Sequence, residues 1–284
     1  MNYRHAYHAG GFADVIKHIV LCLVLAHLRE KPAAFRVIDT HAGAGLYDLT
    51  AQEANKTGEW REGIGRLMTA SLDADVHTLL APYLNAIKSF NPGEKLVSYP
   101  GSPMLVRAFL RRQDRMIACE LEPQAAKALA TNLRGDARIK AIEIDGWTAL
   151  GAYVPPRERR GLVLVDPPFE QPDDFAQLAL GLETAHRKWA TGIYLLWYPI
   201  KEPAEVATFA RRLKRSGIAK ILRVELVVAS ESDEKLRGSG LVVVNPPWTL
   251  DKALARILPA LADIFRRDGE GGIRLDWLSG ESGK

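Results

Sequence analysis

Cysteine is scarce in this sequence, and long apolar runs are absent. The chain has two cysteines, Cys22 and Cys119, and their apolar surroundings predict buried free thiols in a reducing compartment. No group of Cys and His has the spacing of metal ligands, so we expect no metal. No apolar run reaches the ~18 residues that span a bilayer, and the N-terminus lacks the apolar core of a signal peptide. We therefore expect a cytoplasmic protein that does not enter a membrane.

Neither sign of charge dominates the composition. Hydrophobic residues make up 47% of the 284 residues, enough for a full core, and charged residues make up 25%. Lysine and arginine (38) exceed aspartate and glutamate (34), which gives a formal net charge of +4. This excess suits an acidic partner such as nucleic acid, but many basic proteins bind no polyanion. Composition alone therefore leaves the partner open.

Short apolar runs alternate with helical patterns along most of the chain. Five runs predict buried strands: Phe35–Asp39, Arg115–Glu120, Ile139–Ile144, Gly161–Asp166 and Gly192–Trp197. Helical patterns lie before, between and after them, at Asp14–Arg29, Ser102–Leu110, Pro123–Leu133, Phe175–Trp189 and Ala204–Ser216. This alternation predicts an α/β fold, a mostly parallel sheet with helices on both faces. Two later strands, Ile218–Val228 and Leu241–Asn245, are expected to complete it as an antiparallel hairpin around a polar loop at Ser230–Ser239.

One segment interrupts the alternation. From Leu46 to Pro100 the sequence has helical periodicity at Ile64–Ala70 and Val76–Phe90 and no convincing strand. We therefore expect residues 46–100 to form a small helical insertion subdomain. Residues 1–45 and 101–284 are then expected to form the main α/β domain.

Small and acidic residues follow the ends of the first three predicted strands. The first strand runs into a loop with Gly43 and Gly45, which allows a ligand to approach the backbone closely but lacks the third glycine of a dinucleotide fingerprint. Glu120 ends the second strand, where it is placed to accept both hydroxyls of a ribose. Asp145 and Gly146 follow the third strand and suit an adenine amine. Together these residues predict a site for an adenosine-containing cofactor without a pyrophosphate.

The most specific motif is Asp166-Pro167-Pro168-Phe169, which follows the fourth predicted strand. Two consecutive prolines fix φ and make the loop stiff. A stiff loop can hold the carboxylate and a backbone carbonyl where both accept hydrogen bonds from one exocyclic amine, while the ring stacks on the base. Such acceptors take up the charge that develops on a weakly nucleophilic amine as a methyl group arrives. Asp166, Pro167 and Phe169 are therefore the predicted catalytic residues.

A second motif, Asn245-Pro246-Pro247-Trp248, has the same form and also follows an apolar strand. We expect it to have no catalytic role. Asn245 ends what the pattern predicts to be the last strand, at an edge of the sheet far from the cofactor. Asp166, by contrast, follows the strand next after Asp145.

Aromatic and basic side chains alternate at the N-terminus, as contacts with unstacked bases require. These residues are Tyr3, Arg4, His5, Tyr7 and His8. Three further basic clusters could contact phosphates or simply form solvated faces. They are Arg157/Arg159/Arg160, Arg211/Arg212/Lys214/Arg215 and Arg107/Arg111/Arg112/Arg115. The sequence does not distinguish among them.

Several of these strings resemble a known enzyme family. They are Tyr3–Gly10, Ala13–His18, Asp39–Gly45, Tyr99–Pro103, Asp166–Phe169, Gly192–Tyr194 and Trp197–Pro199. Together they resemble the bacterial 23S ribosomal RNA adenine-N6 methyltransferases of the J type. The resemblance runs from near residue 3 to near residue 248 and includes the helical insertion.

The resemblance implies a Rossmann-like methyltransferase domain with S-adenosyl-L-methionine as its cofactor. Asp166 would be the proton acceptor, and Tyr3 would contact the RNA together with its neighbours Arg4 and His5. Lys17 is expected to bind the cofactor carboxylate, and Gly43 to lie in the cofactor loop. The other implied cofactor contacts are His18, His41, Ser102, Glu120, Asp145 and Gly146. The family often has Tyr where this chain has Phe169, but stacking needs only the ring.

The implied substrate is one adenine of 23S rRNA, adenine 2030 in the family, methylated by a monomer without an obligate protein partner. One alternative is a DNA adenine-N6 methyltransferase, which would use the same motif. The sequence, however, offers no second domain large enough to read duplex DNA. Another alternative is a non-catalytic RNA-binding protein on a methyltransferase scaffold, which would have no physical need for the Asp166 loop. The missing third glycine disfavours an NAD-dependent oxidoreductase.

Overall fold

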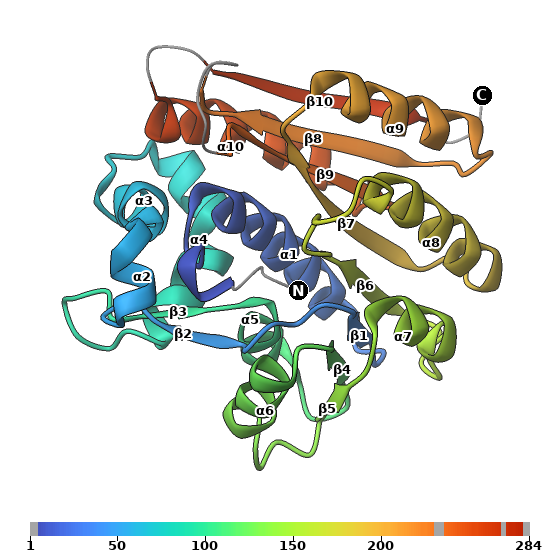
Figure 1. The fold of residues 1–284 in the computed structure, drawn as a ribbon, viewed down its shortest axis with the longest axis horizontal. Helices are drawn as coiled ribbons and strands as arrows, with labels where there is room; N and C mark the ends of the chain where they lie inside the picture. The colour runs from blue at the N-terminus through green and yellow to red at the C-terminus, as the bar shows by residue number, and fades with distance from the viewer. Residues whose placement is uncertain (1–4, 230–235, 268–270, 281–284) are drawn as a thin grey trace.

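An eight-stranded sheet forms the centre of the computed structural model, which describes residues 5–229, 236–267 and 271–280 (Figure 1). The strand order is β10-β8-β9-β7-β6-β1-β4-β5. Strands β7, β6, β1, β4 and β5 are parallel, whereas β9 is antiparallel to β7 and β8, and β10 to β8. The bounds are β1 (Arg36–Asp39), β4 (Arg115–Glu120), β5 (Ile139–Glu143), β6 (Gly161–Val165), β7 (Ile193–Ile200), β8 (Ile221–Val227), β9 (Gly238–Val244) and β10 (Gly272–Ser279).

Helices cover both faces of this sheet, as the alternating pattern predicts. One face packs against α1 (Phe12–Glu30), α5 (Ser102–Phe109), α6 (Pro123–Asn132) and α10 (Leu250–Phe265). The other packs against α7 (Gly146–Tyr153), α8 (Asp174–Lys188) and α9 (Pro203–Arg215). Cys22 and Cys119 are buried free thiols, as predicted. Among the described residues, no helix is long and apolar enough to cross a membrane.

The predicted α/β fold is confirmed, and each predicted strand of the sheet lies within a few residues of its expected bounds. The late antiparallel hairpin is also confirmed as β8 and β9. Part of its predicted loop, residues 230–235, lies outside the described residues. The sequence interpretation did not include α7, α10 or the third antiparallel strand β10.

The segment after β1 contains strands as well as helices, so the expectation of no strand there is wrong. β2 (Leu46–Asp48) pairs with β3 (Ser98–Pro100) in a separate two-stranded antiparallel sheet. Three residues are too few for an alternating pattern to show in the sequence. Between these strands lie α2 (Gln52–Thr57), the π-helix η2 (Arg61–Gly65), α3 (Arg66–Thr69) and α4 (Ala74–Ser89). The segment lies beside α1 at the left of Figure 1 and shares its apolar core.

The expected position of Asn245 at a sheet edge is wrong. Asn245 follows β9, which lies between β7 and β8 inside the sheet and is not its last strand. Because β9 runs antiparallel to β7, Val244 pairs with Tyr194 near the start of β7. Asn245 therefore lies at the edge of the sheet opposite to the carboxyl ends of the parallel strands. Its side-chain amide donates to the carbonyl oxygens of Ala190 and Gly192, both at 2.8 Å.

Candidate active site

The carboxyl ends of four neighbouring parallel strands meet at one edge of the sheet. These strands are β6, β1, β4 and β5, in that order. Asp39 ends β1 and Glu120 ends β4. Asp166 follows β6 directly, and Asp145 lies two residues after β5. The parallel register therefore brings the predicted cofactor residues and the predicted catalytic loop to one edge, as is typical of ligand sites in α/β sheets.

Asp39 is fully buried at this edge. Ser102, at the start of α5, donates from its hydroxyl to Asp39 Oδ2 at 2.6 Å. Within the described residues Asp39 Oδ1 has no hydrogen-bond partner of good geometry, which is costly for a buried polar atom. Burial raises the pKa of the Asp39 carboxyl to about 7, and the nearby Asp166 adds to the rise, although the nearby His41 amide lowers the pKa of the carboxyl. A buried carboxyl oxygen without a partner is a natural acceptor for a hydrogen-donating ligand.

Two glycines keep this edge free of side chains. Gly43 has a φ of +61°, and a Cβ there would lie 2.3 Å from the Tyr47 hydroxyl. A Cβ at Gly146 would lie 2.5 Å from both His41 Nε2 and the Thr40 carbonyl oxygen. Cβ contacts this short essentially do not occur, so a residue other than glycine would displace the Tyr47 side chain at position 43 and the Thr40 backbone at position 146.

Backbone amides orient the two acids predicted to bind the cofactor. Glu120 Oε2 accepts from the Gly43 amide at 2.8 Å, and Oε1 accepts from the amides of Leu121 and Glu122. Asp145 Oδ2 accepts from the Thr148 amide at 2.7 Å, which caps α7. Each carboxylate keeps lone pairs for a further donor. The cofactor roles of both residues remain predictions.

The two predicted histidines are shielded from solvent, His18 fully and His41 in part. His18 is 1% exposed, and its Nδ1 lies 2.8 Å from the Tyr99 hydroxyl. Thr40 donates its hydroxyl proton to a backbone carbonyl, so it accepts from His41 Nδ1 at 2.8 Å. Burial lowers the pKa of His18 to about 3 and that of His41 to about 4. Both rings are therefore neutral at physiological pH.

A chain of ionic contacts links α1 to the predicted catalytic loop. Lys17 Nζ lies 2.7 Å from Asp14 Oδ1 and 2.5 Å from Asp166 Oδ2. His5 donates from Nε2 to Asp14 Oδ2 at 2.9 Å. The carboxylate of Asp14 holds the pKa of Lys17 above its usual range despite burial, and Asp166 adds to this effect. Lys17 is thus paired with two carboxylates in the structure, and its predicted contact with the cofactor carboxylate remains a prediction.

Phe169 has a φ of +49°, a region that bulky side chains rarely adopt. Its ring makes edge contacts with Phe175 at 5.0 Å and Trp197 at 5.7 Å between centroids. Lys17 Nζ lies 5.9 Å from the centre of the Trp197 ring. The strained loop thus places an aromatic surface next to Asp166, as base stacking would require.

The N-terminal residues Tyr3 and Arg4, predicted to contact RNA, lie outside the described residues. Among the described residues, His5 reaches the site through Asp14 and packs against Tyr47 with ring centroids 5.1 Å apart. Sequence reasoning did not identify Asp14 or Trp197 as site residues. A signal for Asp14 was present, because Asp14 and Lys17 are charged residues three apart on the mainly apolar helix pattern of α1.

The fold and this edge define a class of protein. A mostly parallel sheet, a glycine turn after β1, an acid ending β4 and an Asp-Pro-Pro-aromatic loop after β6 are the arrangement of a Rossmann-like methyltransferase. A family model described as Ribosomal RNA large subunit methyltransferase D, RlmJ, matches residues 32–279. The chain belongs to this family.

Similar proteins cover nearly the whole chain. Ribosomal RNA large subunit methyltransferase J of Haemophilus influenzae is 40% identical over 283 residues, 99% of this chain and 100% of that protein. The Escherichia coli protein of the same name is 39% identical over 279 residues, 98% of this chain and 99% of its own length. A crystal structure of a Legionella pneumophila protein matches with a TM-score of 0.87 and 33% identity, covering 95% of this chain and 98% of that one.

Proposed function

We propose that this protein transfers the methyl group of S-adenosyl-L-methionine to the N6 amine of one adenine in 23S rRNA. The observation that carries the proposal is the position of the Asp166 carboxylate. Lys17 holds its Oδ2, and no described residue bonds Oδ1, which leaves one oxygen to accept a hydrogen from an amine. The two curated relatives, named for methylation of large-subunit ribosomal RNA, support the choice of RNA.

The residues at the sheet edge suit S-adenosyl-L-methionine. Asp39 Oδ1 provides an acceptor, and the absence of side chains at Gly43 and Gly146 lets their loops pack closely against Tyr47 and His41. Glu120 would hold the ribose hydroxyls and Asp145 the adenine amine, with Ser102, His18 and His41 lining the site. When bound, the cofactor supplies a methyl group on a sulfonium, which leaves as a neutral thioether.

The protein's own groups would then act on the target base. Asp166 Oδ1 and the Pro167 carbonyl oxygen accept the two amine hydrogens, and Phe169 stacks on the base. As the nitrogen gains a fourth bond it becomes cationic, and the adjacent carboxylate stabilises that charge and accepts the proton released. Lys17 is a positioning residue, because it fixes Oδ2 and thereby aims Oδ1 at the amine.

We further propose that the enzyme acts as a cytoplasmic monomer on RNA.

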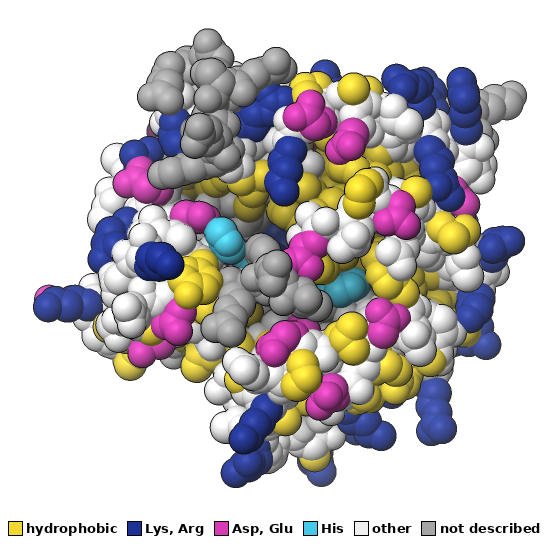
Figure 2. Space-filling view, in the orientation of Figure 1, with side chains coloured by type: hydrophobic (Ala, Val, Ile, Leu, Met, Phe, Trp, Pro, Cys, Tyr) yellow, Lys and Arg dark blue, Asp and Glu magenta, His cyan; other side chains and the backbone are white. Residues whose placement is uncertain are grey.

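The distribution of charge on the surface suits RNA. On the face in Figure 2, acidic and histidine side chains lie toward the middle, whereas Lys and Arg lie mostly around the rim. A polyanion would therefore meet cations at the rim, while the acidic middle suits the amine of a base and a cationic cofactor.

Replacement of Asp166 tests this proposal. We expect Asp166→Ala to lower kcat by at least about a hundredfold, because the amine loses its acceptor, while the affinity for S-adenosyl-L-methionine changes little. The measurement is transfer of labelled methyl to protein-free 23S rRNA, with detection of N6-methyladenine, and calorimetry for cofactor binding. Asn245→Ala is the matched control, because Asn245 lies at the opposite edge of the sheet. It should lower stability without lowering kcat.

Other results would contradict the proposal. Full methylation of RNA by Asp166→Ala would exclude Asp166 as the acceptor, and a catalytic loss in a folded Asn245→Ala protein would favour the second loop. Label on duplex DNA but not on RNA would favour a DNA methyltransferase. Binding of RNA and cofactor without any transfer would favour a non-catalytic RNA-binding protein.

A further inference from the structure

Three arginines lie side by side at the amino ends of neighbouring strands. Arg36 starts β1 and Arg115 starts β4, and the parallel register pairs these two residues directly. Met116 pairs with Ile139, so Arg138 comes next to Arg115 on the following strand. Like charges on adjacent strands destabilise a sheet unless something neutralises them. The row therefore needs counter-charges.

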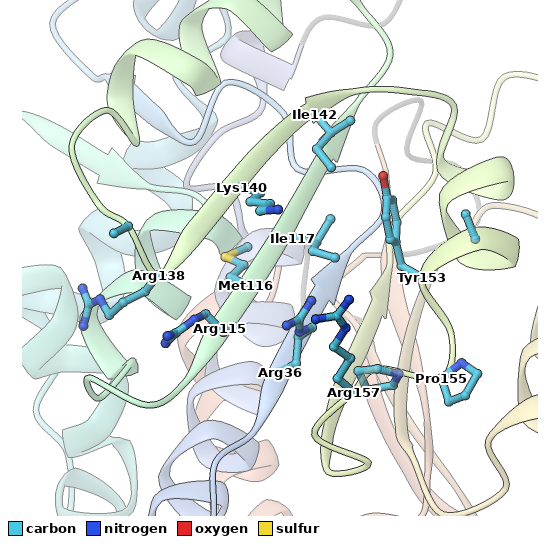
Figure 3. Close-up of a pocket in the computed structure, with 13 residues that line it drawn as sticks. Arg36, Arg115, Met116, Ile117, Arg138, Lys140, Ile142, Tyr153, Pro155 and Arg157 are labelled. Atoms are coloured by element: carbon cyan, nitrogen blue, oxygen red, sulfur yellow. The ribbon is translucent and has the colours of Figure 1, made fainter.

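The row lines a pocket of about 580 Å³ on the sheet face that α7 covers only in part (Figure 3). Lys140 and Arg157 add two more cations to its lining, which contains no Asp or Glu. Ile117, Ile142 and Tyr153 supply apolar and aromatic surface. In Figure 3 the side chains of Arg36 and Arg157 extend toward the same part of the pocket.

Protein carboxylates neutralise only part of this charge. Glu158 binds Arg36 through two hydrogen bonds of 2.8 and 2.9 Å, and Asp136 binds Arg138. Arg115 donates to two backbone carbonyl oxygens, those of Arg112 and Asp114. Lys140 and Arg157 are exposed, and neither they nor Arg115 pair with a carboxylate of the described residues. About three positive charges thus face the pocket without a counter-charge.

Three of the other basic residues singled out in the sequence, Arg111, Arg160 and Arg212, are bound within the fold. Arg111 contacts Asp114 and the carbonyl oxygens of Lys31 and Ala33. Arg160, like Arg115, donates to two backbone carbonyl oxygens, but it does not line the pocket. Arg212 pairs with Glu183. The pocket with unneutralised charge therefore combines Arg115 and Arg157, which belong to two different basic clusters of the sequence.

We propose that this pocket binds phosphates of the substrate RNA that flank the target adenine. The inference rests on the proposed function. The pocket lies at the amino ends of β1 and β4, whereas Asp166 follows a carboxyl end. Strands of four to six residues separate the two positions by roughly 13–20 Å at ~3.3 Å per residue. The pocket therefore holds neighbouring RNA, with a cationic rim for phosphates and Tyr153 for an unstacked base.

The double variant Lys140→Gln/Arg157→Gln tests the inference, because both side chains are exposed and their loss leaves the fold intact. We expect KM for 23S rRNA to rise about tenfold, with kcat and cofactor affinity unchanged. The plot of log(kcat/KM) against log salt should become less steep by roughly 1.5, as expected for two lost phosphate contacts. The matched control is Arg211→Gln/Arg215→Gln, two exposed arginines on and at the end of α9.

An unchanged KM and an unchanged salt dependence in the Lys140/Arg157 variant would overturn the inference. The same is true if only the Arg211/Arg215 control raises KM, because the pocket that these two arginines line together with Arg187 and Arg212 would then be the RNA surface. Failure of the wild-type enzyme to methylate RNA at all would instead reject the proposed function. Thermal unfolding of both variants shows whether any loss reflects stability.

Discussion

Burial and charged partners together set the ionisation of single side chains at the candidate site. Burial lowers the pKa of His41 to about 4 and raises that of Asp39 to about 7, so both groups favour their neutral forms. Asp14 is equally buried, but contacts with His5 and Lys17 hold its pKa well below the usual range. Ionic contacts with neighbouring side chains, rather than the extent of burial, thus decide which buried acid stays charged.

The pKa of Asp39 predicts a dependence of stability on pH. The folded-state pKa of about 7 lies above the ordinary value of 3.8. The contribution of Asp39 to stability is therefore fully present below pH about 4 and is lost as the pH rises through 7. We expect the free energy of unfolding of the wild type, relative to Asp39→Asn, to fall between pH 5 and pH 8. Urea unfolding at four pH values measures this difference.

Asparagine is the suitable replacement because it keeps an oxygen that accepts from Ser102 and never ionises. In addition to burial, the side chain of Asp166 raises the pKa of Asp39, and that of Lys17 lowers it. A constant difference between wild type and variant across this pH range would show that Asp39 is ionised throughout. Ser102→Ala serves as a control, because it removes the hydrogen bond without removing the titrating group.

At the scale of elements, α7 begins at the sheet edge because Gly146 allows a close approach. A Cβ there would meet His41 and the Thr40 carbonyl oxygen at 2.5 Å, so Gly146→Ala must push the helix start away from β1. We expect cofactor affinity to fall at least about tenfold and the free energy of unfolding to fall by about 1–3 kcal/mol. Calorimetric titration with S-adenosyl-L-methionine and urea unfolding measure the two effects.

Gly151 in the same helix provides the matched control. A Cβ there would meet no atom within 4 Å, so Gly151→Ala should leave cofactor affinity unchanged. It should also stabilise the protein by about 0.4–1 kcal/mol, because alanine restricts the unfolded chain. Equal cofactor affinity for the Gly146 and Gly151 variants would remove the steric argument for Gly146.

At the scale of the whole molecule, residues 46–100 share one apolar core with the sheet domain. Leu80, Tyr83 and Ile87 of α4 are buried in the same cluster as Ile16 and Ile19 of α1. The predicted insertion subdomain is therefore packed against α1 over a broad apolar surface, and its treatment as a separate unit remains a prediction.

Excision of this segment tests whether it is separable. The Gly101 amide donates to the Gly45 carbonyl oxygen at 2.7 Å, so a short Gly-Ser linker can join these residues. We expect the product not to fold cooperatively. Three large side chains of α4 stabilise the fold by about 1.5–3 kcal/mol each, a sum comparable with a typical total of 5–15 kcal/mol. Circular dichroism and urea unfolding provide the measurement.

The single variant Leu80→Ala is the control for the excision. It should cost about 2–5 kcal/mol and still unfold in one cooperative transition. Cooperative folding of the excised protein with native spectra would instead establish residues 46–100 as an independent subdomain.

The sequence by itself determined the local elements and the motif at the end of each strand. Apolar runs such as Gly161–Asp166 identify buried strands because their pattern is local, and the Pro167-Pro168 pair restricts its own loop. Strands of three residues, such as β2 and β3, could not be predicted from the sequence, because so short a stretch shows no periodicity.

Only the tertiary structure decided which of these elements are neighbours. Strand order placed β9 between β7 and β8, and its antiparallel direction put Asn245 opposite to the Asp166 edge. Likewise, the Lys17–Asp166 pair joins residues 149 positions apart, and the pocket joins Arg36, Arg115 and Arg157. Such contacts depend on strand pairing and core packing between distant segments, and the local sequence pattern predicts neither of them.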